Sequence, residues 1–309
     1  GSRLDFDYNI CLPIDHIENV PVKNAFERIF KWAEAIYKIW LVREEAMEPL
    51  KASQEFEIAA ALQDETRVFP VPETVAEVAS YIASLRRKEG LHAIIDFGAG
   101  TTDVSIFNYM NPFGESRSTW YSARNIPRGC VEIEKALGIN KQRSHPVSET
   151  SAEAVYGQLV GLKELCERDN YCEVARSVYE ILTTLRDSEA QLGAWRVAYK
   201  HLKKQTAWDK ENVQIFITGG GVNLPFVREV FSKPWWEQIE GPYNVEILPA
   251  GDDFFPGPTN APFERVAVAY GLSIPLPALQ DFELPSRAPN HTPPSLPVLQ
   301  LDRDDLYPK

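Results

Sequence analysis

The sequence has few cysteines, no long apolar run and no excess of basic residues. Its four cysteines are scattered without a Cys-x-x-Cys pair, which argues against a disulfide framework and a cysteine metal site and favours reduced, buried thiols. No apolar stretch approaches the ~20 residues of a membrane span, and no signal-peptide pattern opens the chain. These absences predict a cytoplasmic protein without a membrane partner.

Basic residues are also fewer than acidic ones. Lys and Arg total 32 against 44 Asp and Glu, so the formal net charge is −12 at pH 7. This balance disfavours non-specific binding to nucleic acid or to anionic lipid, and neither is an expected partner. The 309 residues are 44% hydrophobic and 25% charged, which is ordinary for a globular protein with a large core.

Strand-like and helix-like runs alternate along the chain, which predicts an α/β architecture. The expected strands are 8–13, 92–96, 103–107 and 213–218, and the expected helices are 26–40, 73–87, 226–231 and 263–272, with further helices through most of 129–202. Apolar residues in 26–40 recur at helical spacing, and we expect this stripe to pack on a sheet. The segment 69–72 (Phe-Pro-Val-Pro) is expected to break the chain. After Pro275 proline becomes frequent, which predicts an extended tail or linker over 276–309.

The strongest local signal is the segment 96–103, Asp-Phe-Gly-Ala-Gly-Thr-Thr-Asp, between two expected strands. A short glycine-rich loop between strands predicts a β-hairpin. Gly98 and Gly100 let backbone amides approach an anion, and Thr101 and Thr102 add hydroxyl donors. Asp96, at the end of a buried strand, is suited to orienting hydrated Mg²⁺. A plain structural hairpin needs the glycines but not the acids and threonines around them.

A second signal follows the expected strand 213–218. The segment 218–225, Thr-Gly-Gly-Gly-Val-Asn-Leu-Pro, places three glycines before a helix, where a flat or anionic ligand can lie against the main chain. Such turns occur in many α/β proteins, so this one gains its meaning from the hairpin that precedes it.

Together these segments resemble the actin-like ATPase superfamily, and within it the nucleotide-binding domain of DnaK-type heat-shock chaperones. Segment 96–106 is similar to the family's second phosphate-binding hairpin, whose Gly-x-Gly-Thr-Thr-Asp form is also close to bacterial actin homologues. Segment 218–225 is similar to its adenosine motif. Segment 72–79 (Pro-Glu-Thr-Val-Ala-Glu-Val-Ala) resembles a helix start before the hairpin, and 126–129 (Ile-Pro-Arg-Gly) resembles a turn that opens the second lobe's upper subdomain.

The resemblance implies an actin-like (ribonuclease H-like) ATPase fold, with two lobes around a nucleotide cleft, and ATP or ADP with Mg²⁺ as cofactors. Asp96 would hold the metal and its waters, Glu73 would act on the attacking water from the facing lobe, and Thr101 would contact the γ-phosphate. The implied nucleotide-binding residues are Gly98, Gly100, Thr101, Thr102, Gly129, Gly219, Gly220, Gly221 and Asn223. Either Lys163 with Glu164 or Arg186 with Glu189 would cover the adenine.

Two departures from the family pattern bear on activity. No segment matches the family's first phosphate motif, an Asp-x-Gly hairpin followed by a catalytic lysine, so we expect an incomplete first lobe and slow hydrolysis by these 309 residues alone. Asn223 stands where the chaperones usually carry arginine, which implies a different contact with the adenine base. Segment 297–302 faintly resembles the chaperones' interdomain linker.

The resemblance also implies a division of the chain. It assigns 1–90 to the remainder of the first lobe, 91–128 to the second-lobe core with the phosphate hairpin, 129–204 to a helical upper subdomain, 205–255 to the core with the adenosine motif, 256–275 to a helix returning to the first lobe, and 276–309 to the tail. The expected function is an ATP-driven conformational switch of chaperone type, with a protein client, a co-chaperone or a missing N-terminal half as partner. A filament-forming actin homologue and a non-hydrolysing nucleotide sensor or scaffold are the alternatives, and a sugar kinase of the same fold is least favoured.

Overall fold

The computed structural model describes residues 7–43, 67–111, 114–136, 173–199, 213–223, 226–232, 243–256, 262–279 and 281–288. The strands in these residues form two sheets. The smaller sheet pairs β1 (Asp7–Leu12) with β2 (Arg67–Pro72) in parallel. The larger sheet consists of β3 (Gly90–Phe97), β4 (Thr102–Met110), β5 (Arg117–Ile126), β6 (Val213–Thr218), β7 (Tyr243–Ile247) and β8 (Asp281–Glu283).

The order of the larger sheet is β7-β6-β3-β4-β5-β8. Strand β4 is antiparallel to both of its neighbours, while β6, β7 and β8 each run parallel to the strand they join, so β4 alone is reversed. A central hairpin and meander flanked by parallel strands is the sheet of the actin-like (ribonuclease H-like) α/β fold. The predicted fold class is confirmed, and so is the hairpin between β3 and β4.

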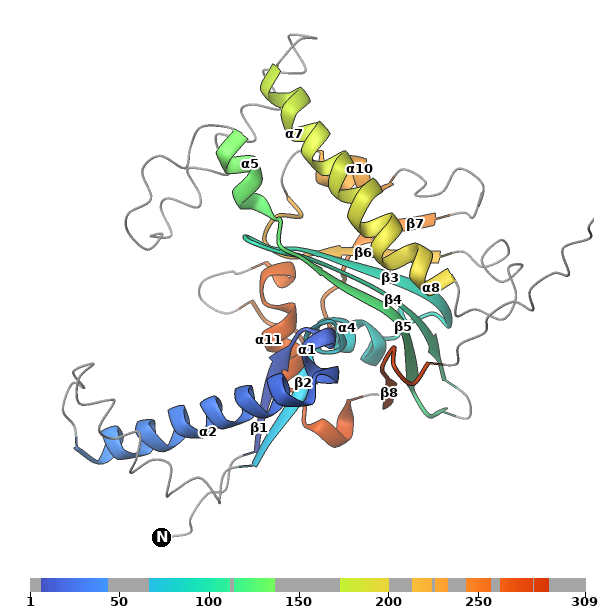
Figure 1. Cartoon of the computed structure of the whole chain (residues 1–309). Coiled ribbons are helices and arrows are strands. Elements are labelled where there is room, and N and C mark those ends of the chain that lie inside the picture. The colour runs from blue at the N-terminus through green and yellow to red at the C-terminus, as the bar shows by residue number, and fades with distance from the viewer. Residues whose placement is uncertain are drawn as a thin grey trace, which may run out of the picture.

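Helices cover both faces of this sheet (Figure 1). On one face lie α5 (Cys130–Ala136), α7 (Glu173–Thr184), the π-helical η4 (Leu185–Trp195), α8 (Arg196–Tyr199) and α10 (Val227–Ser232). On the other lie α1 (Ile14–Glu18), α4 (Glu73–Ala83) and α11 (Ala267–Leu272). Side chains of β3 alternate between the two cores, since Ala93 and Ile95 join the first cluster and Ile94 the second.

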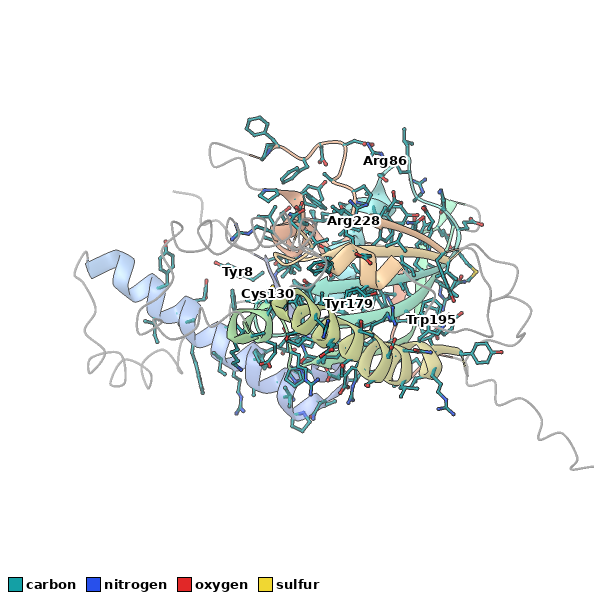
Figure 2. The ribbon with its side chains drawn as sticks, turned by 90° about the horizontal axis from the view of Figure 1, so that it is seen from above. Tyr8, Arg86, Cys130, Tyr179, Trp195 and Arg228 are labelled. Carbon is teal, nitrogen blue, oxygen red and sulfur yellow. The ribbon has the colours of Figure 1, made fainter. Side chains whose placement is uncertain are left out.

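Aromatic side chains pack within the first helical layer and between this layer and the sheet. Trp195 on η4 meets Tyr243 on β7 at a ring-centroid distance of 5.5 Å, and Tyr179 on α7 meets Phe226 at 6.3 Å, both edge to face. Figure 2 shows Tyr179 and Trp195 along this layer, seen from above. Where most of 129–202 was expected to be helical, the described residues form α5, α7, η4 and α8, and residues 137–172 lie outside the described residues.

Close contact between α4 and α11 fixes the position of α4. A Cβ on Gly271 would lie 1.8 Å from the carbonyl oxygen of Ala76, so only glycine permits this approach of the two helices. The packing matters for function because α4 begins at Glu73.

The structure differs from the expected break at 69–72, because these residues belong to β2. Pro70 and Pro72 are paired with Ile10 and Leu12 of β1. Because the two prolines are two residues apart, their backbone nitrogens point to the same side of the strand. Strand β2 has a neighbour on one side only, so the N–H groups that proline lacks are not needed on the other side. Strands β5 and β7 were likewise not predicted.

The apolar stripe expected to pack on a sheet lies on α2 (Val20–Arg43) and does so in part, since Phe30 packs on Tyr8 of β1 at a ring-centroid distance of 5.2 Å. Phe26, Ile29 and Tyr37 are 43%, 54% and 53% exposed, whereas Glu34 and Ala35 on another face are buried. Helical periodicity predicted the helix correctly, but it cannot identify which surface covers the apolar face. Within the described part of the chain, no helix has the length and apolar character to cross a membrane.

The chain after Pro275 also departs from the expected tail. Residues 276–278 form the 3₁₀ helix η6, and β8 joins the edge of the six-stranded sheet beside β5. Ala288 is buried against the core, and the amide of Ser286 donates to Glu18 at 2.8 Å. The folded part therefore extends at least to residue 288, because Phe282, Leu284 and Ala288 pack against the two apolar clusters and Ser286 bonds to α1.

Candidate functional site

Four carboxylates gather where α4 begins and the central hairpin turns. Asp96 is the last residue but one of β3, and its register places it opposite Asp103 on β4 and Thr218 on β6. Glu73 opens α4, and Glu77 follows one helical turn later on the same face. Glu77 is only 1% exposed and Glu73 is half-buried. The charges of Asp96, Glu73 and Asp103 all raise the pKa of Glu77, and Asp103 also raises the pKa of Glu73 and of Asp96, so the four acids share one electrostatic environment.

Burial is the largest cause of the pKa shifts in this cluster. It raises the pKa of Asp96 to about 7, with the charges of Asp103 and Glu73 adding to the effect. Burial and the charge of Asp96 raise the pKa of Glu77 well above its usual range, while a hydrogen bond from Thr218 acts in the opposite direction. The pKa values of Glu73 and Asp103 are also raised, although Asn125 donates to Asp103 at 2.9 and 3.1 Å and opposes the rise. Without a cation, this cluster favours protonated carboxyl groups.

Two oxygen atoms of this cluster have no hydrogen-bond partner. Asp96 Oδ1 and Glu77 Oε2 are both buried and unpaired, and such groups are costly unless a ligand or water satisfies them. Among the described residues, no three His, Cys, Asp or Glu side chains lie close enough together to hold a metal. A cation here would therefore take other ligands as well, which suits Mg²⁺, since it binds through one or two carboxylates and keeps waters or phosphate oxygens.

The glycine hairpin is held next to the N-terminus of α5. The amide of Gly98 donates to the carbonyl of Thr101 at 2.9 Å and closes the turn. The carbonyls of Gly98 and Ala99 accept from the amides of Cys130 and Val131 at 3.0 and 2.9 Å. A Cβ on Gly129 would lie 2.6 Å from the Gly98 carbonyl oxygen, so glycine is required for this approach.

The second glycine segment docks beside the end of β3. The amide of Gly221 donates to the carbonyl of Phe97 at 2.9 Å, and that of Gly219 donates to the carbonyl of Glu264 at 3.1 Å. The amide side chain of Asn223 donates to the Glu264 carboxylate at 2.7 Å. The hairpin and the triple glycine, remote in sequence, thus meet around the end of β3.

Not every predicted site residue faces outward. Thr102 is fully buried, and its hydroxyl donates to the carbonyl of Arg128 at 2.7 Å, so it anchors the turn between β5 and α5 rather than offering a hydroxyl at the surface. Gly100 and Thr101 are exposed at the tip of the hairpin, and Gly220 is exposed in the second turn.

Neither predicted adenine-covering pair is supported by a contact at the site. Arg186 donates to Asp187 at 2.6 Å and to the carbonyl of Val230 at 3.0 Å, both within the helical layer. Lys163 and Glu164 lie outside the described residues.

Sequence reasoning missed Glu77 and Glu264. Glu77 carried a weak signal, an acid in the middle of an otherwise apolar helix four residues after Glu73. Glu264 carried no signal, because its contacts with the turn include two made by the backbone carbonyl, which every residue type has. This carbonyl accepts from the Gly219 amide and, at 3.4 Å, from the Thr218 hydroxyl.

Gly219→Ala is expected to destabilise the protein by at least about 2 kcal/mol. Gly219 has φ +88°, which costs other residues about 1–2 kcal/mol. A Cβ there would also lie 2.0 Å from Asp96 Oδ1 and 2.7 Å from the Phe97 carbonyl oxygen, which adds an overpacking cost. Gly220→Ala is the matched control, since its nearest neighbour is Arg265 Nε at 4.0 Å. Urea unfolding of both variants measures the difference, and equal stabilities would contradict the geometry.

Glu77→Gln is expected to stabilise the metal-free protein at pH 7 but not at pH 4. The folded-state pKa of Glu77 is raised above its ordinary value of 4.5, so between these two values the folded state binds more protons than the unfolded state. Stability from this group is therefore full below pH 4.5 and falls as the pH rises towards the raised pKa. Glutamine keeps the shape and stays neutral, which removes this loss.

Thermal unfolding in EDTA at both pH values measures the effect. Glu180→Gln, on the exposed side of α7, is the control and should shift neither midpoint. An equal gain for Glu77→Gln at pH 4 and pH 7 would show that packing, not charge, explains it.

No protein-family model matches the sequence, and no curated protein matches it significantly. Similar solved structures include the ethanolamine utilization protein EutJ from Carboxydothermus hydrogenoformans, with 14% identity, 74% of this chain and 61% of that chain covered, and a TM-score of 0.36. A PilM–PilN type IV pilus biogenesis complex has 14% identity, 74% and 59% coverage, and a TM-score of 0.40. The archaeal actin homologue Ta0583 has 17% identity, 67% and 55% coverage, and a TM-score of 0.35. This chain spans less than two-thirds of the length of each of these structures.

Proposed function

We propose that this chain binds ATP with Mg²⁺ and acts as a nucleotide-dependent conformational switch that hydrolyses ATP slowly. The observation that supports this proposal is the meeting of two glycine turns beside two buried, unpaired carboxylate oxygens. The turns present main chain to an anion, and the carboxylates suit the cation that accompanies it.

Asp96 would hold the cation. Its Oδ1 atom is buried and unpaired at the end of β3, beside the exposed tip of the hairpin. When bound, Mg²⁺ would neutralise the negative charge on the phosphate oxygens. Glu77 lies behind Asp96 and would orient the carboxylate or a water next to it.

The hairpin tip and Glu73 would act on the terminal phosphate. Gly100 and Thr101 are exposed and would offer amides and a hydroxyl, whereas the Gly98 amide already donates within the turn. Glu73 has a raised pKa and lies near Asp103. An acid with these properties would position a water for attack or accept its proton.

The turn 219–223 would hold the nucleoside. Gly220 is exposed, and Gly221 packs its backbone on Phe97 and Cys130, where a Cβ would approach within 2.3 and 2.5 Å. Asn223 and Glu264 form a hydrogen-bonded pair beside the turn, and we propose that they contact the sugar or base edge. The division of the chain stated above is kept as part of this proposal, except that residues 281–288 belong with the second-lobe core.

A protein partner forms part of the proposal. The stripe on α2 leaves three large apolar side chains, Phe26, Ile29 and Tyr37, about half exposed along one helix face, and such a face commonly marks a protein contact. This observation favours a filament-forming ATPase as the second candidate function. Light scattering that rises with protein concentration and ATP would separate a filament former from a monomeric switch.

Calorimetric titration with ATP tests the proposed function. We expect binding in the presence of Mg²⁺ that weakens by at least an order of magnitude in EDTA, because the phosphates then face the carboxylates without a cation. Absence of binding under both conditions would overturn the proposal.

A further inference from the structure

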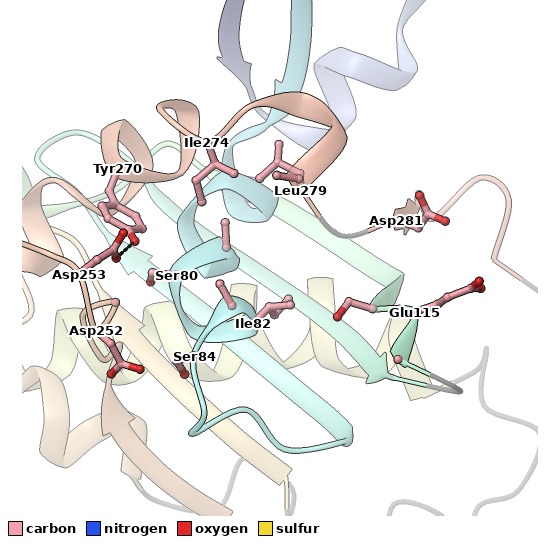
Figure 3. Close-up of a pocket in the computed structure, with 16 residues that line it drawn as sticks. Ser80, Ile82, Ser84, Glu115, Asp252, Asp253, Tyr270, Ile274, Leu279 and Asp281 are labelled. Atoms are coloured by element: carbon pink, nitrogen blue, oxygen red, sulfur yellow. Dashed lines mark hydrogen bonds between the residues drawn. The ribbon is translucent and has the colours of Figure 1, made fainter.

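A pocket of about 670 Å³ lies at the opposite end of α4 from the acidic cluster. Glu73 begins the helix, and its last residues line the pocket, about 15 Å further along at the usual rise per residue. The other walls come from the turn 114–116 after β4, the loop 251–253 and the segment 274–281 (Figure 3). None of these residues belongs to the proposed nucleotide site.

The floor of the pocket is apolar. It is formed by side chains of α4 and of the segment that follows α11, namely Ala79, Ile82, Ile274, Ala278 and Leu279. Such a surface favours the apolar part of a ligand, at roughly 25 cal/mol per Å² buried.

Hydrogen bonds hold two opposite walls in place. On one side, Tyr270 donates its hydroxyl to Asp253 (Figure 3), and the amide of Phe254 donates to the carbonyl of Gly251 at 3.0 Å. The rings of Phe254, Phe263 and Tyr270 pack edge to face behind this loop. On the other side, the amide of Asp281 donates to the carbonyl of Ser116 at 3.1 Å. The pocket is therefore formed before any ligand arrives, which lowers the entropic cost of binding.

The rim of the pocket is acidic on both sides. Asp252 and Asp253 lie on one side, and Glu115 and Asp281 lie on the other (Figure 3). No Lys or Arg is among the lining residues. Arg87 does not line the pocket, and its guanidinium donates to the backbone carbonyl of Ser84 at 3.0 Å. All four carboxylates are on exposed residues, and that of Asp253 accepts from the Tyr270 hydroxyl, which leaves Glu115, Asp252 and Asp281 for the test below.

We propose that this pocket docks a segment of a partner protein in which apolar residues alternate with lysine or arginine. The methylene stems of such basic side chains lie on an apolar floor while their charged ends reach an acidic rim. The same negative rim repels nucleic acid and anionic lipid. A small polyamine would satisfy the rim but leave the apolar floor exposed to water, so the combination of floor and rim favours a peptide.

The test is fluorescence anisotropy with the full chain and a labelled peptide of alternating leucine and arginine. The triple variant Glu115→Gln, Asp252→Asn, Asp281→Asn should weaken binding about tenfold or more, since each exposed ion pair contributes modestly and three add. Its matched control is Glu132→Gln, Glu180→Gln, Glu189→Gln, which removes the same total charge from helices on the other face of the sheet. The control should bind like the wild type.

A second pair of variants tests the floor without removing acids. Ala83→Arg places a guanidinium at the end of α4 inside the pocket and should abolish peptide binding, because it occupies the site. Leu85→Arg adds the same group two residues later, at a side chain that is 90% exposed and does not line the pocket, and should not weaken binding.

Loss of binding in the pocket variants but not in their controls supports the proposal. It is overturned if both triple variants lose affinity equally, if the peptide does not bind, or if a leucine–glutamate peptide binds as well. Displacement of the labelled peptide by spermidine at the same concentration as by unlabelled peptide would also overturn it, because a free amine would then be sufficient. ATP binding has no part in these outcomes.

Discussion

Asp96→Asn is expected to remove the Mg²⁺-dependent part of ATP binding, with a loss of affinity of about 100-fold. Asparagine keeps the size of the side chain but not the charge that faces the cation, and the oxygen it retains is a weaker ligand. Losses of this size occur when groups that hold or support a bound metal are changed. Calorimetric titration with ATP in Mg²⁺ and in EDTA measures the effect, and the variant should show the same weak binding under both conditions.

The same variant provides its own test of folding. Because burial raises the pKa of Asp96 to about 7, the carboxylate costs stability as the pH rises towards 7 in the metal-free protein. Asp96→Asn should therefore unfold at a higher temperature than the wild type at pH 8 in EDTA, even though it binds ATP poorly. Asp187→Asn, on the helical face of the sheet, is the control for ATP binding. Unchanged affinity of Asp96→Asn in Mg²⁺ would remove Asp96 from the metal site.

Glu73→Gln is expected to slow ATP hydrolysis about 100-fold or more while ATP still binds. Loss of a positioned acid–base group typically costs a factor of 10² to 10⁴, and glutamine cannot accept the proton of an attacking water. Single-turnover measurement of phosphate release is the suitable assay, because slow hydrolysis is expected from the wild-type chain. Calorimetry on the same variant should give an ATP affinity within a few-fold of the wild type.

A structural role for Glu73 predicts a different result. An acid in the first turn of a helix interacts favourably with the helix dipole, by less than about 1 kcal/mol. In that case Glu73→Gln would lower the unfolding temperature slightly and leave turnover within a factor of a few, which would contradict the catalytic assignment.

The exposed stripe on α2 shows where periodicity stops being informative. The spacing of Phe26, Ile29, Ala33 and Tyr37 predicted a helix with an apolar face, and both features are present. The expected packing on a sheet is present at Phe30, which contacts Tyr8 of β1, but Phe26, Ile29 and Tyr37 stay about half exposed. The pattern records only that one side of the helix is apolar. What covers that side depends on the position of the helix in the fold and on other molecules.

The sequence by itself determined the local features of this protein. Alternation of apolar runs predicted the α/β class, and the glycines at 98 and 100 predicted a tight hairpin next to Asp96, since turn chemistry depends on adjacent residues. Only the tertiary structure decided what lies across from these features. It placed Glu77 and Thr218 beside Asp96, converted the prolines of 69–72 into an edge strand, added β8 to the sheet and built an acidic pocket from four separate segments. Each of these depends on contacts between residues far apart in the chain, which composition, periodicity and spacing do not record.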